Sequence, residues 1–169
     1  MLDATQTFLD RADQRLALLD ERLAQAATAR EVAWTVCEFA GRELALADCV
    51  LYLPDGADSL LQQAAWGPKR AAEQVLESRI RLAVGRGVVG DCARQQATQR
   101  VVDTRQDARY VADDQVNLSE LAVPLLHGGR VMGVLDSEHP DPGFYEPRHE
   151  QALQAIADRA AARLLQLQG

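Results

Sequence analysis

The chain has 169 residues, a hydrophobic content of 47% and a charged content of 25%, values typical of one globular domain with a sizeable core. Its formal net charge is −7, from 18 basic and 25 acidic residues, and no stretch of the sequence concentrates the basic ones. This argues against nucleic-acid binding, because affinity for phosphates comes mainly from clustered Lys and Arg.

Three cysteines, Cys37, Cys49 and Cys92, lack the spacing of a metal site and suit free thiols in a reducing compartment. The first residues lack the pattern of a secretion signal, and no apolar run approaches the roughly 18 residues of a transmembrane helix. We therefore expect a cytoplasmic protein without a membrane span. The three dispersed histidines predict no metal site.

Residues 1–27 predict an amphipathic helix that precedes a second unit at 28–169. Its apolar residues recur with a period of about 3.5, which is typical of the seam of a coiled coil or helical bundle. The seam consists of Leu2, Leu9, Ala12, Leu16, Leu19, Leu23 and Ala26. Two interpretations are open: the seam pairs with a second copy in a homodimer, or it packs along its own domain.

Thr28 predicts the N-cap of a second helix that reaches Leu46, and Glu31 completes a capping box three residues later. The elements that follow are predicted from local apolar patterns and from turn residues. They are strands at 48–53 and 59–66, a loop or short helix at 69–77, a strand at 79–84, a helix at 91–96 and a short strand at 99–103.

Residues 104–117 form a polar loop that is long enough to act as a lid. The apolar runs 121–126 and 131–135, separated by a Gly-Gly turn, then predict a β-hairpin. Pro147 begins the last helix, where its missing N–H is harmless. Helices at both ends with an antiparallel sheet between them indicate an α+β fold.

Three acids lie where the hairpin strands leave their apolar cores. Asp136 and Glu138 share a face, because side chains alternate along a strand. A two-residue turn would oppose Glu120 to Ser137 on the other face, whereas a three-residue turn would pair it with Asp136. Acids that converge under a lid favour a cationic or zwitterionic ligand; the alternative is a solvated cluster at the strand ends.

Four ordered blocks resemble the GAF domain family: VGRGVVG (84–90), VVDTRQDARY (101–110), LSELAVPLLHGGRVMGVLDSEHP (118–140) and the terminal amphipathic helix. The resemblance runs from about Arg30 to Leu167. It implies a six-stranded antiparallel sheet with a terminal-helix bundle on one face and a ligand pocket on the other, roofed by Gly85–Tyr110. The blocks most resemble GAF domains found beside bacterial sensor kinases, which implies an output partner such as a histidine kinase.

One enzymatic branch of this family, the free methionine-(R)-sulfoxide reductases, shares the SE…GVLD signature. The resemblance places its loop cysteine on Val89 and an earlier cysteine on Arg79, and the lid contains no cysteine. Sulfoxide reduction needs an attacking thiolate and a resolving thiol, so we expect no catalytic residue here. Cys92, near a predicted helix N-terminus where the dipole lowers a thiol pKa, is the candidate for any remaining reactivity, although most such cysteines are small core residues.

These observations predict a non-enzymatic sensory module, dimeric through its helices, that binds a small metabolite. Trp66 and Tyr110 are expected as aromatic walls of the pocket, although a tryptophan at a strand end equally suits core packing. The expected ligand-binding residues are Trp66, Val89, Tyr110, Glu120, Asp136 and Glu138. The alternatives are a small enzyme related to the sulfoxide reductases and a structural dimerisation domain without a ligand. No ligand or cofactor identity follows from the residues.

Overall fold

A six-stranded antiparallel sheet organises the chain, and the computed structural model describes residues 3–113 and 115–169. In spatial order its strands are β5 (Arg81–Ala83), β2 (Ser59–Trp66), β1 (Cys49–Pro54), β8 (Arg130–His139), β7 (Ser119–His127) and β6 (Gln99–Val101). This confirms the predicted α+β class and the antiparallel sheet.

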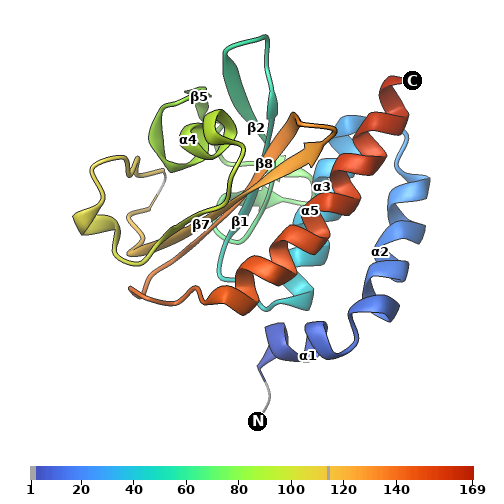
Figure 1. Ribbon diagram of the computed structural model, residues 1–169, viewed down its shortest axis with the longest axis horizontal. Helices are drawn as coiled ribbons and strands as arrows, with labels where there is room; N and C mark the ends of the chain where they lie inside the picture. The colour runs from blue at the N-terminus through green and yellow to red at the C-terminus, as the bar shows by residue number, and fades with distance from the viewer. Residues whose placement is uncertain (1–2, 114) are drawn as a thin grey trace.

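Two layers cover the sheet, one on each face (Figure 1). Helices α2 (Ala12–Gln25), α3 (Ala29–Glu43) and α5 (Pro147–Gln168) lie on one side. Helix α4 (Gly87–Gln95) and the loop after β6, which opens with the short helix η1 (Thr104–Gln106), lie on the other. None of the described helices combines the length and the hydropathy needed to cross a bilayer.

The first predicted helix is two helices in the structure, α1 (Ala4–Asp10) and α2, because the backbone breaks at Arg11. Leu16, Leu19 and Leu23 of the seam are buried in one core with residues of α3 and α5. Leu2, the first seam position, lies outside the described residues. The seam is therefore used within the chain, and the homodimer stays a prediction without that support.

The cap at the start of α3 is confirmed. The Glu31 N–H donates to Thr28 Oγ1 at 3.1 Å, while the Glu31 carboxylate accepts from the Ala27 N–H at 2.5 Å. The helix ends at Glu43, three residues before the predicted end, and the next residue but one, Ala45, has a φ of 50°.

Residues 69–77 were predicted as a loop or short helix, and that prediction is wrong. They form a small separate hairpin of β3 (Arg70–Ala72) and β4 (Val75–Leu76), which pairs Arg70 with Leu76. The N–H of Glu77 closes it by donating to the Lys69 carbonyl at 2.7 Å. The hairpin thus fixes the position of Lys69, the residue that precedes β3.

Helix α4 begins at Gly87, four residues earlier than predicted. Of the three glycines in VGRGVVG (84–90), Gly87 and Gly90 therefore lie in its first turns. Gly87 has a φ of +70°, which favours glycine, and a Cβ on Gly90 would lie 2.5 Å from the Ala83 carbonyl oxygen. The glycines therefore let α4 lie directly against β5. The segment between β5 and α4 is therefore a tight strand-to-helix turn, which brings the first turn of α4 over the sheet.

Candidate functional site

The register of the central hairpin brings all three predicted acids to one face. Gly128 and Gly129 form a two-residue turn with His127 opposite Arg130, but an irregularity at Leu125–Leu126 shifts the pairing by one residue. Beyond it Glu120 lies opposite Glu138, and Ala122 lies opposite Asp136. The register differs from both predicted alternatives, and it nevertheless places Glu120, Asp136 and Glu138 together on the α4 side of the sheet.

These carboxyl groups are buried: Glu120 is 5% exposed, Asp136 2% and Glu138 7%. The alternative of a solvated cluster at the strand ends is therefore wrong. Among the described residues, Asp136 Oδ1 and Glu138 Oε1 have no hydrogen-bond partner. Unpaired buried acceptors are uncommon in folded proteins, because each forgoes the hydrogen bonds it would make with water.

Burial raises the pKa of every acid in this group. It raises the pKa of Glu120 to about 7 and, with the charges of Glu120 and Asp48 adding to the effect, that of Glu138 to about 9. The pKa of Asp136 lies well above its ordinary value, first through burial and then through the charges of Glu120 and Glu138. The acids therefore hold protons near neutral pH, and a cation placed among them would favour their ionised forms.

A fourth acid, Asp48, joins the cluster from the residue before β1. Its Oδ1 accepts the Glu138 N–H at 3.1 Å, and its carbonyl accepts the Ser137 hydroxyl at 2.5 Å. Burial raises the pKa of Asp48 to about 7. Asp48 was not among the predicted site residues, although an acid directly before a buried strand is the same signal that identified Glu120.

Two adjacent cavities lie between the sheet and its α4-side cover. The inner one is lined by Val89 of α4, by the three hairpin acids and by Asp113, among other residues. Its volume is about 10 Å³, which is room for roughly one water molecule. The outer cavity has a volume of about 70 Å³. Its walls include Asp48, Lys69, Asp113 and Glu138, so Asp113 and Glu138 line both cavities.

The loop over these cavities is fastened to the sheet side by Asp113. Its Oδ1 lies 2.8 Å from Lys69 Nζ, and its Oδ2 accepts from Gln62 Nε2 at 2.7 Å. Gln62 is itself fixed, because its Nε2 also donates to the Tyr52 hydroxyl at 2.8 Å and its Oε1 accepts the Ile80 N–H at 2.9 Å. We call this set, Asp113 with Lys69 and Gln62, the latch.

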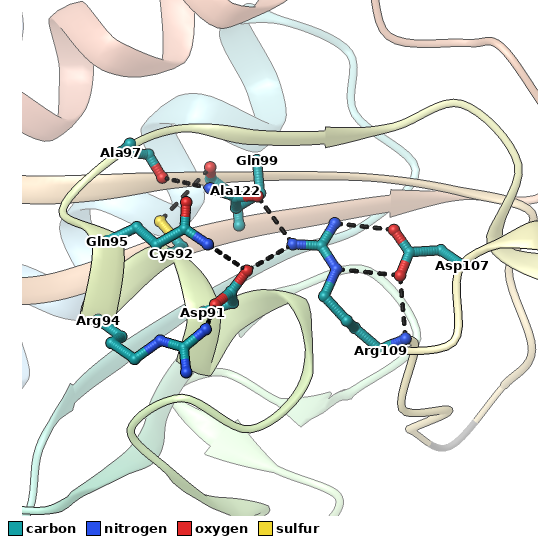
Figure 2. Close-up of polar contacts among 9 residues, drawn as sticks. All are labelled: Asp91, Cys92, Arg94, Gln95, Ala97, Gln99, Asp107, Arg109 and Ala122. Carbon is teal, nitrogen blue, oxygen red and sulfur yellow. Dashed lines mark hydrogen bonds and ion pairs between the residues drawn. The ribbon is translucent and has the colours of Figure 1, made fainter.

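The start of the same loop is fastened to α4 and β6 by Arg109 (Figure 2). Arg109 makes two contacts with the Asp107 carboxylate, at 3.0 and 2.8 Å, and its Nη1 donates to Asp91 at 2.6 Å and to Gln99 at 2.8 Å. Arg94 and Gln95 also donate to Asp91, which is 3% exposed. We call this set, Arg109 with Asp91, Gln99 and Asp107, the clasp. The clasp holds the start of the loop against α4 and β6, while the latch holds the loop over the cavities.

Tyr110 follows the clasp and lies beside Glu138, but it lines neither cavity, so its expected place as an aromatic wall of the pocket stays a prediction. Its hydroxyl accepts the Asn117 N–H at 3.0 Å and also lies within hydrogen-bonding reach of the Glu138 carboxyl group. Burial raises the pKa of Tyr110 well above its ordinary value, so the phenol stays protonated and can donate to Glu138.

Trp66 does not line either cavity, and its predicted place in the pocket is wrong. It lies opposite Cys49 on the helix-covered face, where its ring fills the space beside Gly41: a Cβ there would lie 2.2 Å from Trp66 Cγ. Its Nε1 donates to the Leu46 carbonyl at 3.2 Å. The tryptophan is a packing residue between β2 and α3.

All three cysteines are buried, and none lines either cavity. Cys92 lies in the second turn of α4, where its Sγ donates to the Ala122 carbonyl at 3.6 Å (Figure 2). Burial raises the pKa of Cys92 to about 12, which fits a small core residue and does not support a thiol activated by the helix dipole. Within residues 3–113 and 115–169, no group of His, Cys, Asp and Glu has an arrangement that could hold a metal ion.

Comparisons with known proteins agree with this architecture. A family model described as GAF domain matches residues 26–164. The free methionine-R-sulfoxide reductase of Escherichia coli (strain K12) is 31% identical over 77 residues, which are 46% of this chain and 47% of that protein. The chain spans about half the length of the curated relatives it matches.

Two solved structures show the same fold at low identity. One is the free methionine-R-sulfoxide reductase of Neisseria meningitidis in complex with its substrate, with a TM-score of 0.76, 22% identity and coverage of 90% of this chain and 87% of that one. The other is the GAF domain of an Acinetobacter phosphoenolpyruvate-protein phosphotransferase, with a TM-score of 0.78, 17% identity and coverage of 92% and 93%.

Proposed function

Because this chain belongs to the GAF domain family, we propose that it is a non-enzymatic cytoplasmic sensory module whose pocket binds a small metabolite with a positively charged group. One observation carries this proposal: Asp136 Oδ1 and Glu138 Oε1 are buried beside a cavity without hydrogen-bond partners among the described residues. A ligand ammonium offers several donors and a positive charge, so it would supply what both oxygens lack.

Three features support a receptor over a reductase. The position that the resemblance assigns to the loop cysteine is Val89, whose side chain lines the inner cavity. Arg79, at the second assigned position, is exposed. The thiols of this chain lie outside both cavities, and burial raises the pKa of Cys92. Attack on sulfur requires a thiolate within reach of the ligand.

The hairpin offers a direct mechanical route from the pocket to the helices. The face of the hairpin toward α4 carries the acids. On the opposite face, Leu121, Val123 and Leu125 belong to the same hydrophobic core as Leu153 and Ile156 of α5. A ligand that binds better to one position of the hairpin would shift the population of α5 positions. The signal would then pass to an output partner such as a histidine kinase, through α1, α2 and α5 or through a homodimer of them.

A thermal-shift panel of small cationic and zwitterionic metabolites tests the proposal. A ligand at 100 times its dissociation constant stabilises the folded state by about 2.7 kcal/mol. For a chain of this length that corresponds to roughly 5–10 °C in Tm. We expect Asp136→Asn to abolish the shift and the exposed-residue control Asp58→Asn to retain it. Equal shifts in Asp136→Asn and wild type would contradict the proposal.

The second candidate function is sulfoxide reduction, which the similarity to the Escherichia coli enzyme favours. The test is incubation with free methionine sulfoxide and a thiol reductant, repeated with Cys92→Ser. Turnover that depends on Cys92 would overturn the receptor proposal. Binding of the sulfoxide without turnover would support it.

A further inference from the structure

Lys69 is the only lysine in the sequence; every other residue among the 18 basic ones is an arginine. It is 3% exposed and lines the outer cavity beside Asp48, Asp113 and Glu138. A buried ammonium is costly unless it is paired, so this lysine depends on the anionic groups that the cavity supplies. A lysine at this place indicates a site where a compact positive charge meets a carboxylate.

Lys69 and Gln62 together form a receptor for one carboxylate. Lys69 Nζ contacts Oδ1 of Asp113, and Gln62 Nε2 contacts Oδ2, at 2.8 and 2.7 Å. Both donors are held from the sheet side, Gln62 by its bonds to Ile80 and Tyr52 and Lys69 by the β3–β4 hairpin and by Ser78 Oγ at 3.0 Å. The carboxylate that they hold comes from the loop, through the single side chain of Asp113.

Asp113 also separates the two cavities, because it lines both of them. The outer cavity contains Lys69, and the inner cavity contains Glu120 and Asp136. The inner cavity has room for roughly one water molecule in this state, so an amino acid cannot reach the hairpin acids. Withdrawal of Asp113 would join the two cavities into one pocket with carboxyl groups at its inner end and with Lys69 and Gln62 nearer its mouth.

We propose that the ligand is a zwitterion of amino-acid type, whose carboxylate replaces that of Asp113 on Lys69 and Gln62 while its ammonium enters the acid cluster. This rests on the proposed function and names the class of its ligand. Asp113 is then an internal competitor that occupies the anion site of the ligand-free protein. The exchange replaces one carboxylate by another on the same donors, so the contacts of Lys69 and Gln62 are conserved.

The charge balance favours this exchange. The charge of Asp113 adds to the repulsion that raises the pKa of Asp48 and Glu138. When Asp113 leaves, the zwitterion brings a carboxylate for Lys69 together with a positive charge for the hairpin acids. A cation without a carboxylate would gain only the interaction with the hairpin acids. Asp113 would then stay bound to Lys69 and Gln62.

The first test requires no ligand. Lys69 and the N-terminal α-amino group are the only primary amines of the chain, so acetylation by an N-hydroxysuccinimide ester can be followed at each by mass spectrometry. We expect Lys69 of the folded protein to react, relative to the α-amino group, at least tenfold more slowly than Lys69 of the urea-unfolded protein. Asp113→Asn should accelerate Lys69 at least fivefold, and Asp58→Asn should not. Fast acetylation of Lys69 in wild type would refute the inference that Asp113 holds Lys69 in the latch.

The second test compares free amino acids, with methionine sulfoxide included, and the corresponding amines that lack the carboxylate, by calorimetric titration. Asp113→Asn should bind the amino acids at least fivefold more tightly than wild type. Lys69→Gln should weaken them at least tenfold and leave the amines unchanged. Equal losses for both series would overturn this inference and leave the proposed function standing. Binding of neither series to wild type or to Asp113→Asn would overturn the proposed function as well.

Discussion

Replacement of Glu120 by Gln should stabilise the protein above neutral pH. Glu120 is 5% exposed and burial raises its pKa to about 7, so its ionisation is resisted in the folded state. Its carboxyl group shares a hydrogen bond with Asp136, and the amide oxygen of Gln can accept the same proton. The substitution therefore removes a costly charge while it conserves the shape and one hydrogen bond.

The magnitude follows from the difference between the folded and unfolded pKa values. Between 4.5 and about 7 the folded state binds more protons at Glu120 than the unfolded state does, so the free energy of unfolding falls as the pH rises. At about 1.4 kcal/mol per pKa unit the loss is complete at pH 8 and amounts to about 3 kcal/mol at most. The gain in Glu120→Gln has the same upper limit, or roughly 6–12 °C in Tm.

Urea denaturation of wild type and Glu120→Gln at pH 4.5 and pH 8 measures this effect. We expect nearly equal stabilities at pH 4.5, where both side chains are neutral, and a more stable variant at pH 8. The exposed-residue control Glu73→Gln should change stability by no more than about 0.5 kcal/mol at either pH. A variant that is less stable at pH 8, or a gain that is independent of pH, would refute the reasoning.

Three further substitutions test the surrounding structure. Arg109→Gln should cost about 1–2 kcal/mol and accelerate hydrogen exchange in residues 104–110, because the clasp loses its charged contacts; unchanged exchange would refute the clasp. Gly41→Ala should cost about 1–3 kcal/mol in thermal unfolding, since its Cβ would overlap the Trp66 ring, and an unchanged Tm would contradict that packing. Thr28→Ala should cost about 1 kcal/mol in urea, and Thr28→Ser, which retains the cap, should cost less.

The sequence predicts most elements of this fold because its local signals agree with the tertiary structure. Thr28 caps α3, Pro147 begins α5 and Gly-Gly closes the central hairpin, and each of these signals acts over only a few residues. The segment 69–77 was missed because its strands are two and three residues long and leave no periodic pattern.

The convergence of the acids could not be derived from the turn alone. The turn has the two residues that the sequence indicates, and a two-residue turn without further irregularity would send Glu120 to the opposite face. The shift at Leu125–Leu126 restores the shared face with Asp136 and Glu138. Such an irregularity depends on the packing of both strands, because Gly133 on β8 lies so close to β1 that a Cβ would be 2.6 Å from the Tyr52 carbonyl oxygen.

Two other patterns permit more than one packing partner, and the sequence alone does not choose between them. A 3.5-residue seam has the same sequence whether it packs on its own domain or on a second copy, and here Leu16, Leu19 and Leu23 pack on their own domain. Trp66 was expected as an aromatic wall of the pocket, with core packing as the alternative, and the space beside Gly41 decides its face. Lys69 was overlooked although its uniqueness is visible in the sequence itself.

The central claim is that the buried hairpin acids receive the positive charge of a ligand. Calorimetric titration of the tightest-binding zwitterion at pH 7.5, in two buffers with different ionisation enthalpies, measures the protons released on binding. We predict a net release, because a cation converts Glu120, Asp136 and Glu138 toward their ionised forms, and a smaller release with weaker binding in Asp136→Asn. Binding without proton release, and with equal affinity in Asp136→Asn, would contradict the account.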